Sequence, residues 1–415
     1  MARQQDGEAL GLSDVPVPTL VWALVAAAAG LNLAVGVALA LRQPARASDL
    51  LEMYDWCRTW LLGQHQLYAG PDASTDYPPN AIVMLSPLAL VPWRWVVPIW
   101  TAVALALTPL LPYLVVRCTS HRRLFTAAAI PMLLFFCWAG ARTLLQFTLL
   151  SMTLMFASVL LVDSRWLASG IFLGLALAKP HIAGPIAVWA MLTRRIRVVA
   201  VAGVVVLAGV AAYDARVHEN PLVTLSGYWH VLVATYGGPE GFIGLTSVRA
   251  WAYAITADPR WADTLWAVAA GLLLVVPSWL AVGDSHRSAE GIGMAVPSLF
   301  CLWSLLTFYH NGNNLIMMLP AFVFLLLVDD RDTVRQRWLF AAFLQAVLMF
   351  DVPIRLKPFA PARGAFRILI LDFDRFVVLI TFVYIVMLLR RLSQRRADQR
   401  DPAVHAGSRR PIPSR

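Results

Sequence analysis

Five acidic residues follow the first long apolar stretch of the chain, which is long enough to cross a bilayer. They are Asp49, Glu52, Asp55, Asp72 and Asp76. Asp49 comes just after the apolar stretch, so its carboxylate is expected close to the membrane surface. A carboxylate placed there can act as a general base on a hydroxyl of a substrate carried by the membrane. Asp49 is therefore the first candidate catalytic residue.

The spacing of these acidic residues predicts a shared surface. A helix over residues 48–62 would place Asp49 and Glu52 on one face, because positions three or four apart are neighbours on a helix. Trp56 continues that face. A simpler interpretation is that Ser48 or Asp49 only caps the start of the helix.

Ionisable and amide side chains recur at the predicted outer ends of later apolar stretches. They are Arg142, Gln146, Lys179, His181, His310, Asn311, Asn313 and Asn314. Polar groups at membrane depth are costly and are usually functional or paired. Lys179 is especially informative because it breaks two apolar runs together with Pro180 and His181; the alternative is a lysine that extends its ammonium to the membrane surface. His310 beside three asparagines indicates a polar patch facing a cavity.

Tyr77 precedes two consecutive prolines, Pro78 and Pro79. Tandem proline is excluded from a helix interior but suits the first turn of a helix. We therefore expect a helix over residues 80–92 whose start is fixed by this motif.

The elements that must position these groups are membrane helices. Of the 415 residues, 59% are hydrophobic and 14% are charged, and the mean hydropathy is +0.65, whereas a soluble domain carries about a quarter charged residues. This excludes a soluble globular protein. The net charge of +10 comes mostly from arginines beside apolar runs, as positive-inside sorting predicts, so nucleic-acid binding is not expected. The four cysteines are scattered and show no metal-ligand spacing or disulfide framework.

The apolar runs predict an all-α integral membrane protein with about twelve transmembrane helices, because broken or protein-buried segments can be shorter than a full span. We expect spans at 18–41, 95–116, 124–138, 144–162, 166–178, 182–193, 197–213, 263–283, 291–308, 314–328, 338–350 and 376–391. The first run is too long for a signal peptide and is expected to remain as a helix. Residues 1–391 form one polytopic domain, followed by a disordered cytoplasmic tail over 392–415.

A cytoplasmic N-terminus places every compact arginine cluster on the cytoplasmic side. The clusters are Arg117–Arg123, Arg165, Arg194–Arg197, Arg287, Arg331–Arg337 and the tail from Arg390. Counting residues 80–92 as a span would invert this pattern, so we expect a juxtamembrane or re-entrant helix there. Two large loops, 42–94 and 214–262, then face outward, and functional groups are commonly carried by such loops. A third outward loop, 351–375, is the one basic exception to this pattern.

The segment from Asp49 to Pro92 resembles the opening signature of the polytopic C-class (GT-C) glycosyltransferases of family eighty-seven. The residues that carry the resemblance are Asp49-Leu50, Tyr54, Leu62-Gly63, Leu67-Tyr68, Tyr77-Pro78-Pro79 and Ser86-Pro87-Leu88-Ala89-Leu90-Val91-Pro92. Weaker similarity continues at Leu145-Gln146, Lys179-Pro180, Thr246-Ser247 and from Tyr309-His310 to Pro320. The resemblance covers roughly residues 45–330.

The resemblance implies a GT-C-type fold with a catalytic first outer loop, 42–94, that contains juxtamembrane helices. Such enzymes use polyprenyl-phosphate sugars and include mycobacterial mannosyltransferases and arabinofuranosyltransferases. By similarity, Asp49 takes the position of the catalytic aspartate. The chain departs from the family pattern at Leu145, Leu245-Thr246 and Asn313-Asn314, where the family has a glycine, an Asn-Gln pair and a histidine or acidic pattern. These departures leave the sugar open.

The expected reaction is transfer of a sugar, with mannose favoured, from a polyprenyl-phosphate donor to a lipid-linked or cell-envelope glycan. It would occur on the outer face of the bacterial cytoplasmic (inner) membrane, with inversion and with Asp49 as general base. The candidates for binding the donor phosphate are Arg142, Lys179, His181 and His310. The candidates for binding substrate are Glu52, Tyr54, Tyr68, Tyr77, Gln146, Ser247 and Asn314. These cations make a metal cofactor unnecessary, so none is expected.

Three alternatives remain open at this point. The donor sugar can be arabinofuranose instead of mannose. An O-antigen ligase or polymerase is also polytopic with a large outer loop, although such proteins do not usually carry an acidic cluster and a Tyr-Pro-Pro motif in the first outer loop. A transporter or flippase for a lipid-linked sugar would place charged or broken positions near the middle of the bilayer, whereas here they gather near one face.

Overall fold

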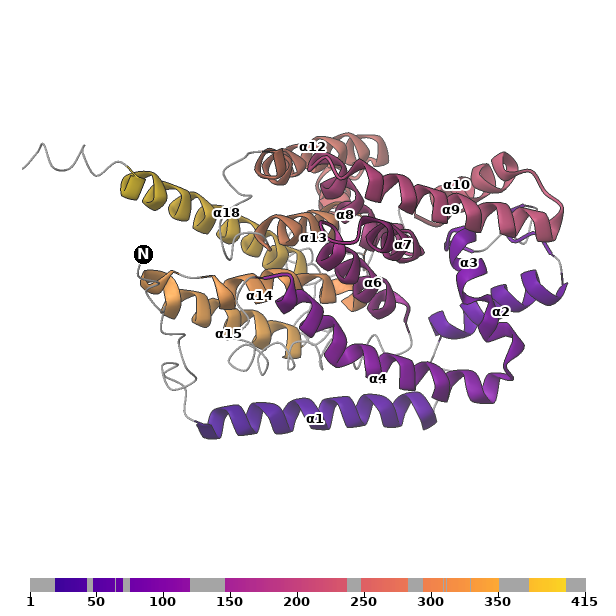
Figure 1. The fold of residues 1–415 in the computed structure, drawn as a ribbon, viewed down its shortest axis with the longest axis horizontal. Coiled ribbons are helices and arrows are strands. Elements are labelled where there is room, and N and C mark those ends of the chain that lie inside the picture. Colours follow the sequence, from indigo (N-terminus) through magenta and orange to yellow (C-terminus); the bar gives the residue numbers. More distant parts are fainter. Residues whose placement is uncertain are drawn as a thin grey trace, which may run out of the picture.

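The computed structural model describes eleven ranges of the chain. They are 19–42, 48–63, 65–69, 75–119, 146–236, 248–282, 294–308, 310, 312–328, 330–350 and 373–400. Within these ranges all regular structure is helical. Figure 1 shows α2, α3 and α10 together at one end of the long axis and the end of α18 at the other.

The N-terminal helices frame the first predicted outer loop. They are α1 (Thr19–Arg42), α2 (Ser48–Gly63), α3 (Pro79–Leu85), the 3-10 helix η3 (Ser86–Leu90) and α4 (Trp93–Arg117). Pro79 occupies the first turn of α3, as the tandem proline predicts. The helix expected over 80–92 is divided into two short pieces, neither of which is long enough to cross a bilayer.

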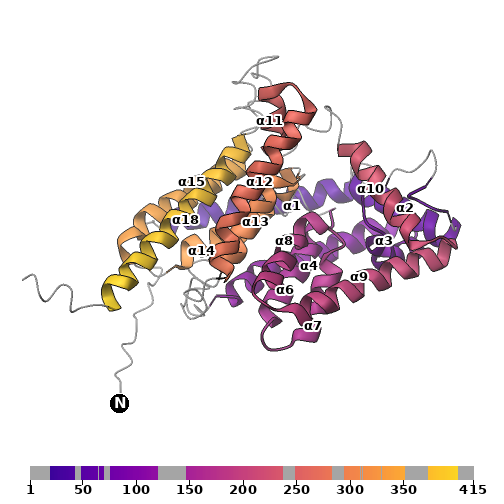
Figure 2. The same cartoon turned by 90° about the horizontal axis from the view of Figure 1, so that it is seen from above.

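The middle of the chain is a series of antiparallel helices. They are α6 (Thr148–Leu161), α7 (Trp166–Ala176), α8 (Pro180–Leu192), α9 (Ile196–Val217) and α10 (Pro221–Tyr236). The α6–α7 and α8–α9 connections meet at one end, where Arg195 pairs bidentately with Asp163 at 3.0 Å. Figure 2 shows α7 and α9 side by side, and they are in contact.

Glycines let two short helices pack successively along α9. A methyl group added at Gly174 would lie 2.5 Å from Cβ of Val205, so α7 approaches the first half of α9 closely. At Gly209, farther along α9, a methyl group would lie 2.6 Å from Cβ of Asn80, which belongs to α3. Helix α9 is long and apolar enough to cross a membrane. The short helix α3 therefore packs beside the second half of a candidate membrane-crossing helix, as expected of a re-entrant or juxtamembrane helix.

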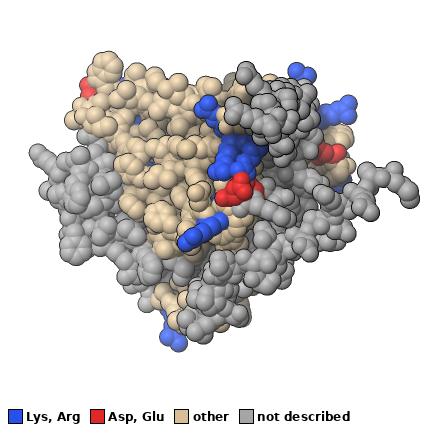
Figure 3. All heavy atoms as spheres, turned by 90° about the vertical axis from the view of Figure 1, so that its left-hand side faces the viewer, with Lys and Arg blue, Asp and Glu red and all other residues tan. Residues whose placement is uncertain are grey.

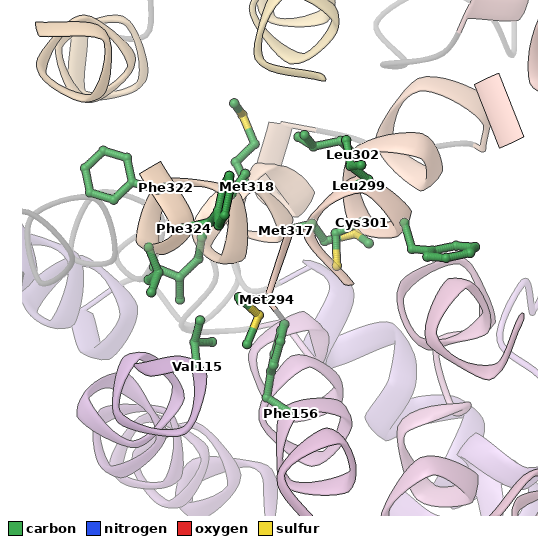
Figure 4. Close-up of a cluster of buried hydrophobic side chains, with 14 of the residues drawn as sticks. Val115, Phe156, Met294, Leu299, Cys301, Leu302, Met317, Met318, Phe322 and Phe324 are labelled. Atoms are coloured by element: carbon green, nitrogen blue, oxygen red, sulfur yellow. The ribbon is translucent and has the colours of Figure 1, made fainter. Parts of the chain in front are cut away.

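The C-terminal helices enclose the hydrophobic core. They are α11 (Val248–Thr256), α12 (Pro259–Val282), α13 (Ala295–Thr307), the 3-10 helix η6 (Gly312–Met318), α14 (Leu319–Leu327), the 3-10 helix η7 (Arg331–Thr333), α15 (Val334–Phe350) and α18 (Phe373–Arg400). Every residue of α13 and α14 is buried. Figure 4 shows side chains of these helices, including Leu299, Phe322 and Phe324, in one cluster with Val115 of α4 and Phe156 of α6. Two stretches far apart in sequence therefore share one core.

The expectation of twelve spans is met only in part. Four helices are long and apolar enough to cross a membrane: α4, α9, α12 and the part of α18 up to Arg395. Helix α1 is also 24 residues long, whereas the apolar helices α6, α7, α8, α13 and α14 are shorter. Two of them, α7 and α13, end where polar residues begin, at Lys179 and before His310. The expected span 124–138 lies outside the described residues.

The tail expected to be disordered from residue 392 begins as helix instead. Helix α18 continues to Arg400, because the sequence there is rich in arginine, leucine and glutamine, which favour helix. Arg395 also binds Asp330 at 2.7 Å and pairs with Asp332, which ties α18 to the α14–α15 connection. Figure 3 looks onto this end of the molecule, where a group of basic and acidic side chains lies together.

Candidate functional site

Lys179 lies in the break between α7 and α8. Pro180 occupies the first turn of α8, so the helix begins there, and Lys179 precedes it with a non-helical backbone (φ −122°, ψ 86°). The Lys179 side chain is 5% exposed, and its ammonium donates a hydrogen bond to Thr148 Oγ1 at 3.0 Å. Thr148 is the first residue of α6. The ammonium is thus buried between the starts of two helices.

Thr148 connects Lys179 to two of the predicted amide residues. A hydroxyl has one proton, and Thr148 Oγ1 donates it to Asn314 Oδ1 at 2.9 Å. Gln146 Oε1 lies 3.4 Å from the same hydroxyl. Gln146 and Asn314 are both buried, although they come from opposite halves of the chain. Three predicted site residues, Lys179, Gln146 and Asn314, therefore form one buried polar cluster.

Tyr77, from the first outer loop, faces this cluster. The Lys179 ammonium lies 5.2 Å from the centroid of the Tyr77 ring, within the range of a cation–π interaction. Trp56 of α2 packs against the same ring, with centroids 6.1 Å apart. The predicted face of α2, which carries Asp49 and Glu52, is thus the face that meets Tyr77.

The pKa shifts of charged groups in the site reflect both burial and mutual proximity. Burial lowers the pKa of Lys179 from 10.5 to about 8, and the charges of Asp49 and Asp76 oppose this shift. The pKa of Glu52 is raised by partial burial first, then by Asp49 and Asp76. The Asp49 and Asp76 carboxylates consequently act on the same cation. Such an arrangement can take a proton at a carboxylate while a cation stabilises a developing anion.

His181 and His310 form a separate buried pair. Their ring centroids are 5.1 Å apart in an edge-to-face arrangement. Ser304 Oγ donates to the His181 carbonyl oxygen at 2.5 Å and lies 3.1 Å from His310 Nε2. Because the serine proton is already used, His310 Nε2 must be the donor in the second bond. His310 is fully buried, so this pair joins the start of α8 to the end of α13.

Two predicted substrate-binding tyrosines are buried and use their hydroxyls inside the protein. Tyr54 is 3% exposed and donates to the Val91 carbonyl oxygen at 3.1 Å. Tyr68 is 2% exposed and donates to the Tyr77 carbonyl oxygen at 2.7 Å. Their hydroxyls are therefore used within the protein, and their role in binding substrate stays a prediction.

Sequence reasoning missed two hydroxyls that link the cluster, Thr148 and Ser304. Thr148 carries a weak signal, since it lies two positions after Gln146 at the start of an apolar run, but nothing in the sequence pairs Ser304 with His310. Asp76 belongs to the predicted acidic cluster but was not among the predicted site residues. It becomes a candidate site residue because its charge acts on Lys179, Glu52 and Tyr228. The predicted residues Arg142 and Ser247 lie outside the described residues, as do Asn311 and the side chain of Asn313.

The second outer loop also reaches the site, through α10. Tyr68 packs edge-to-face against Tyr228 of α10, with centroids 5.8 Å apart. An open groove of about 660 Å³ runs between α10 and Tyr68. Its lining residues are Tyr68, Ala69, Leu222, Val223, Ser226, Gly227, His230, Val231, Ala234 and Thr235. The described residues contain no group of three or more His, Cys, Asp or Glu side chains suited to hold a metal ion.

Gly227 allows α10 to approach the first loop. A methyl group added there would lie 2.2 Å from the Tyr68 carbonyl oxygen, and a backbone atom cannot swing away. We expect Gly227→Ala to destabilise the fold by about 1–3 kcal/mol and to lower the unfolding temperature measured in detergent. Gly203→Ala in α9 is the matched control, because its methyl group would meet nothing within 4 Å and alanine favours helix. Equal unfolding temperatures for the two variants would contradict this contact.

Comparison with known proteins places this site within a family. A model of glycosyltransferase family 87 matches residues 75–306. Site residues inside the match are Asp76, Tyr77, Gln146, Lys179 and His181, whereas Asp49 and Glu52 precede it and His310 and Asn314 follow it. No curated protein and no solved structure matches the chain significantly. Because the match covers more than half of a chain rich in apolar helices, this protein belongs to glycosyltransferase family 87 and is a membrane glycosyltransferase.

Proposed function

We propose that this enzyme transfers a sugar, with mannose favoured, from a polyprenyl-phosphate donor to a hydroxyl of a lipid-linked or cell-envelope glycan. The observation that carries the proposal is the buried Lys179 ammonium, on which the charges of Asp49 and Asp76 act from the first outer loop. A base and a cation placed together match the two needs of the reaction. The acceptor must lose a proton, and the phosphate must leave as an anion.

In this mechanism Asp49 accepts the proton of the acceptor hydroxyl while its oxygen attacks the anomeric carbon. The bond from that carbon to the phosphate oxygen breaks on the opposite side, so the configuration inverts. Lys179 stabilises the departing phosphate. Its ammonium has three N–H donors, and among the described residues a hydrogen bond to Thr148 uses one of them.

We propose that the reaction occurs on the outer face of the bacterial cytoplasmic membrane. Arginine distribution supports this placement through the positive-inside rule. The Arg195–Asp163 pair lies at the start of α9, whereas Trp60 of α2 donates to the Tyr213 carbonyl oxygen near the end of α9. The first outer loop and the basic turn therefore lie at opposite ends of one helix.

Purified protein in nanodiscs provides the direct test. We expect radiolabelled polyprenyl-phosphate mannose, supplied with a membrane glycolipid extract, to yield a radiolabelled glycolipid. Turnover of polyprenyl-phosphate arabinofuranose but not of the mannose donor would keep the class and change the sugar. Transfer of a preassembled glycan would favour a ligase or polymerase, and movement of the intact lipid-linked sugar across vesicles without a glycosidic product would favour a flippase.

The rate should not depend on a divalent metal ion. Protein cations can supply the charge that stabilises the leaving phosphate, so EDTA is expected to leave the initial rate unchanged. Added Mg²⁺ or Mn²⁺ should not raise the rate. Loss of activity in EDTA with recovery in Mg²⁺ would instead assign that charge to a metal.

A further inference from the structure

Tyr213, near the end of α9, is the centre of the contact between the two outer loops. It is fully buried and stacks on Trp60 of α2 with centroids 5.6 Å apart. Its hydroxyl accepts a hydrogen bond from the Leu67 backbone N–H at 2.9 Å and donates to Gln66 Oε1 at 2.6 Å. One phenol thus fixes both a side chain and the backbone of the first loop.

Gln66 extends this contact to α10. Its Nε2 donates to Thr224 Oγ1 at 3.1 Å, and Thr224 donates to Asp214 Oδ1 at 2.5 Å. Tyr213, Thr224 and Asp214 are all buried, so losing a partner leaves a polar atom without water to replace it. The network therefore fixes the position of residues 66–68 relative to the second outer loop.

Tyr68 connects this network to the candidate site. Its ring packs on Tyr213, with centroids 5.2 Å apart, and its hydroxyl donates to the Tyr77 carbonyl oxygen at 2.7 Å. Tyr77 in turn places its ring near the Lys179 ammonium. A continuous set of contacts thus runs from the second loop to the cation.

We propose that Tyr68 and Tyr213 are positioning residues that hold the Tyr77 ring against the Lys179 ammonium, so that the second outer loop controls the charge of the site. The inference rests on the proposed function for its role in catalysis, but not for its geometry. If the ring moves away, the ammonium loses a favourable contact in a buried place and gives up its proton at lower pH.

Other groups also act on Lys179 and are left in place by the test variants. They are Asp49 and Asp76 from the first loop, Thr148 from α6, and the His181–His310 pair, whose pKa values are lowered first by burial and further by the Lys179 charge. Tyr68→Phe removes only the hydroxyl that reaches Tyr77, and Tyr213→Phe removes only the hydroxyl that reaches Gln66 and Leu67.

The chain has two lysines, Lys179 and Lys357, which makes a direct measurement possible. Protein grown with lysine labelled by ¹³C at Cε gives two lysine signals, and Lys179→Arg assigns them. We expect the midpoint of the Lys179 titration to fall by about half to one pH unit in Tyr68→Phe and Tyr213→Phe. The signal of Lys357 should not change. Tyr113→Phe in α4, where Arg117 and not Lys179 lies over the ring, is the matched control.

A wild-type Lys179 midpoint in Tyr68→Phe would overturn the proposal, even if the variant unfolds at a lower temperature. If Tyr213→Phe does not fold, the result of Tyr68→Phe alone decides the test. The corresponding result in catalysis is an equal downward shift of the basic limb of the kcat/KM profile. A shifted NMR titration without any transferase activity would keep the positioning role and refute the proposed function, so the two failures are distinguishable.

Discussion

Asp49→Asn is expected to lower kcat by about 10²–10⁴-fold. The amide has the size of the carboxylate but cannot accept the proton of the acceptor hydroxyl. Asp49 stands at the start of α2, on the face that carries Glu52 and Trp56, and its charge acts on Lys179. The initial rate of sugar transfer in nanodiscs measures the effect, with binding of the polyprenyl-phosphate donor measured separately to show that the site is intact.

Two further variants make this result specific. Asp55→Asn changes a carboxylate on the same helix that is exposed and is expected to keep the wild-type rate. Asp76→Asn tests the other carboxylate that acts on Lys179. Full activity of Asp49→Asn would sink the proposed mechanism. If Asp76→Asn alone abolished transfer, the base would be Asp76, which lies inside the family match whereas Asp49 lies before it.

Helix positions in this protein could largely be predicted from apolar runs. The expected span 263–283, for example, corresponds to α12 over Pro259–Val282. The gathering of Lys179, Gln146 and Asn314 was also foreseeable in outline, because each lies at the end of an apolar run on the same expected side. Helical periodicity alone was enough to predict that Asp49 and Trp56 share one face of a helix.

Partners far apart in sequence could not be predicted in the same way. The bond from Thr148 to Asn314 joins residues 166 positions apart, and one sequence gives no measure of which polar groups meet. The family resemblance predicts Tyr54 and Tyr68 at the substrate, although aromatic residues near a membrane surface are common with or without a ligand. Both side chains are buried and both hydroxyls are bonded to backbone carbonyls, which the sequence alone does not show, and their role at the substrate stays a prediction.

The second outer loop was predicted only as a large connection. Helices α10 and α11 within it are short and apolar, and α10 depends on packing against the first loop. The close approach at Gly227 and the bond from Gln66 to Thr224 provide that packing. Tertiary contacts of this kind decide whether a short segment is helical.

Lys179→Met is expected to lower kcat/KM by about 10²–10³-fold, as loss of a group that stabilises a developing anion commonly does. Methionine has a similar length and no charge. Because burying an ammonium disfavours the folded state, the variant should unfold at the same or a higher temperature than wild type. Loss of activity together with unchanged stability would separate a catalytic role from a structural one; wild-type kcat/KM would remove Lys179 from the mechanism.

The pKa of Lys179 predicts how kcat/KM changes with pH. The pKa of Lys179 is about 8, below its ordinary value of 10.5, so the charged form is lost as pH rises through about 8. The kcat/KM of the free enzyme should therefore fall above that pH. A bound phosphate anion raises the pKa of a neighbouring ammonium, so the limb in kcat, which reports the substrate complex, should lie at higher pH.

Lys179→Arg tests whether this limb belongs to Lys179. A guanidinium stays charged at every pH of the assay, so any activity that remains in the variant should no longer fall near pH 8. The larger planar group must also fit beside Thr148 and the Tyr77 ring, so we expect a lower rate than wild type at pH 7. An unchanged limb in this variant would assign the titration to another group, and Lys179 would then bind substrate without setting the pH dependence.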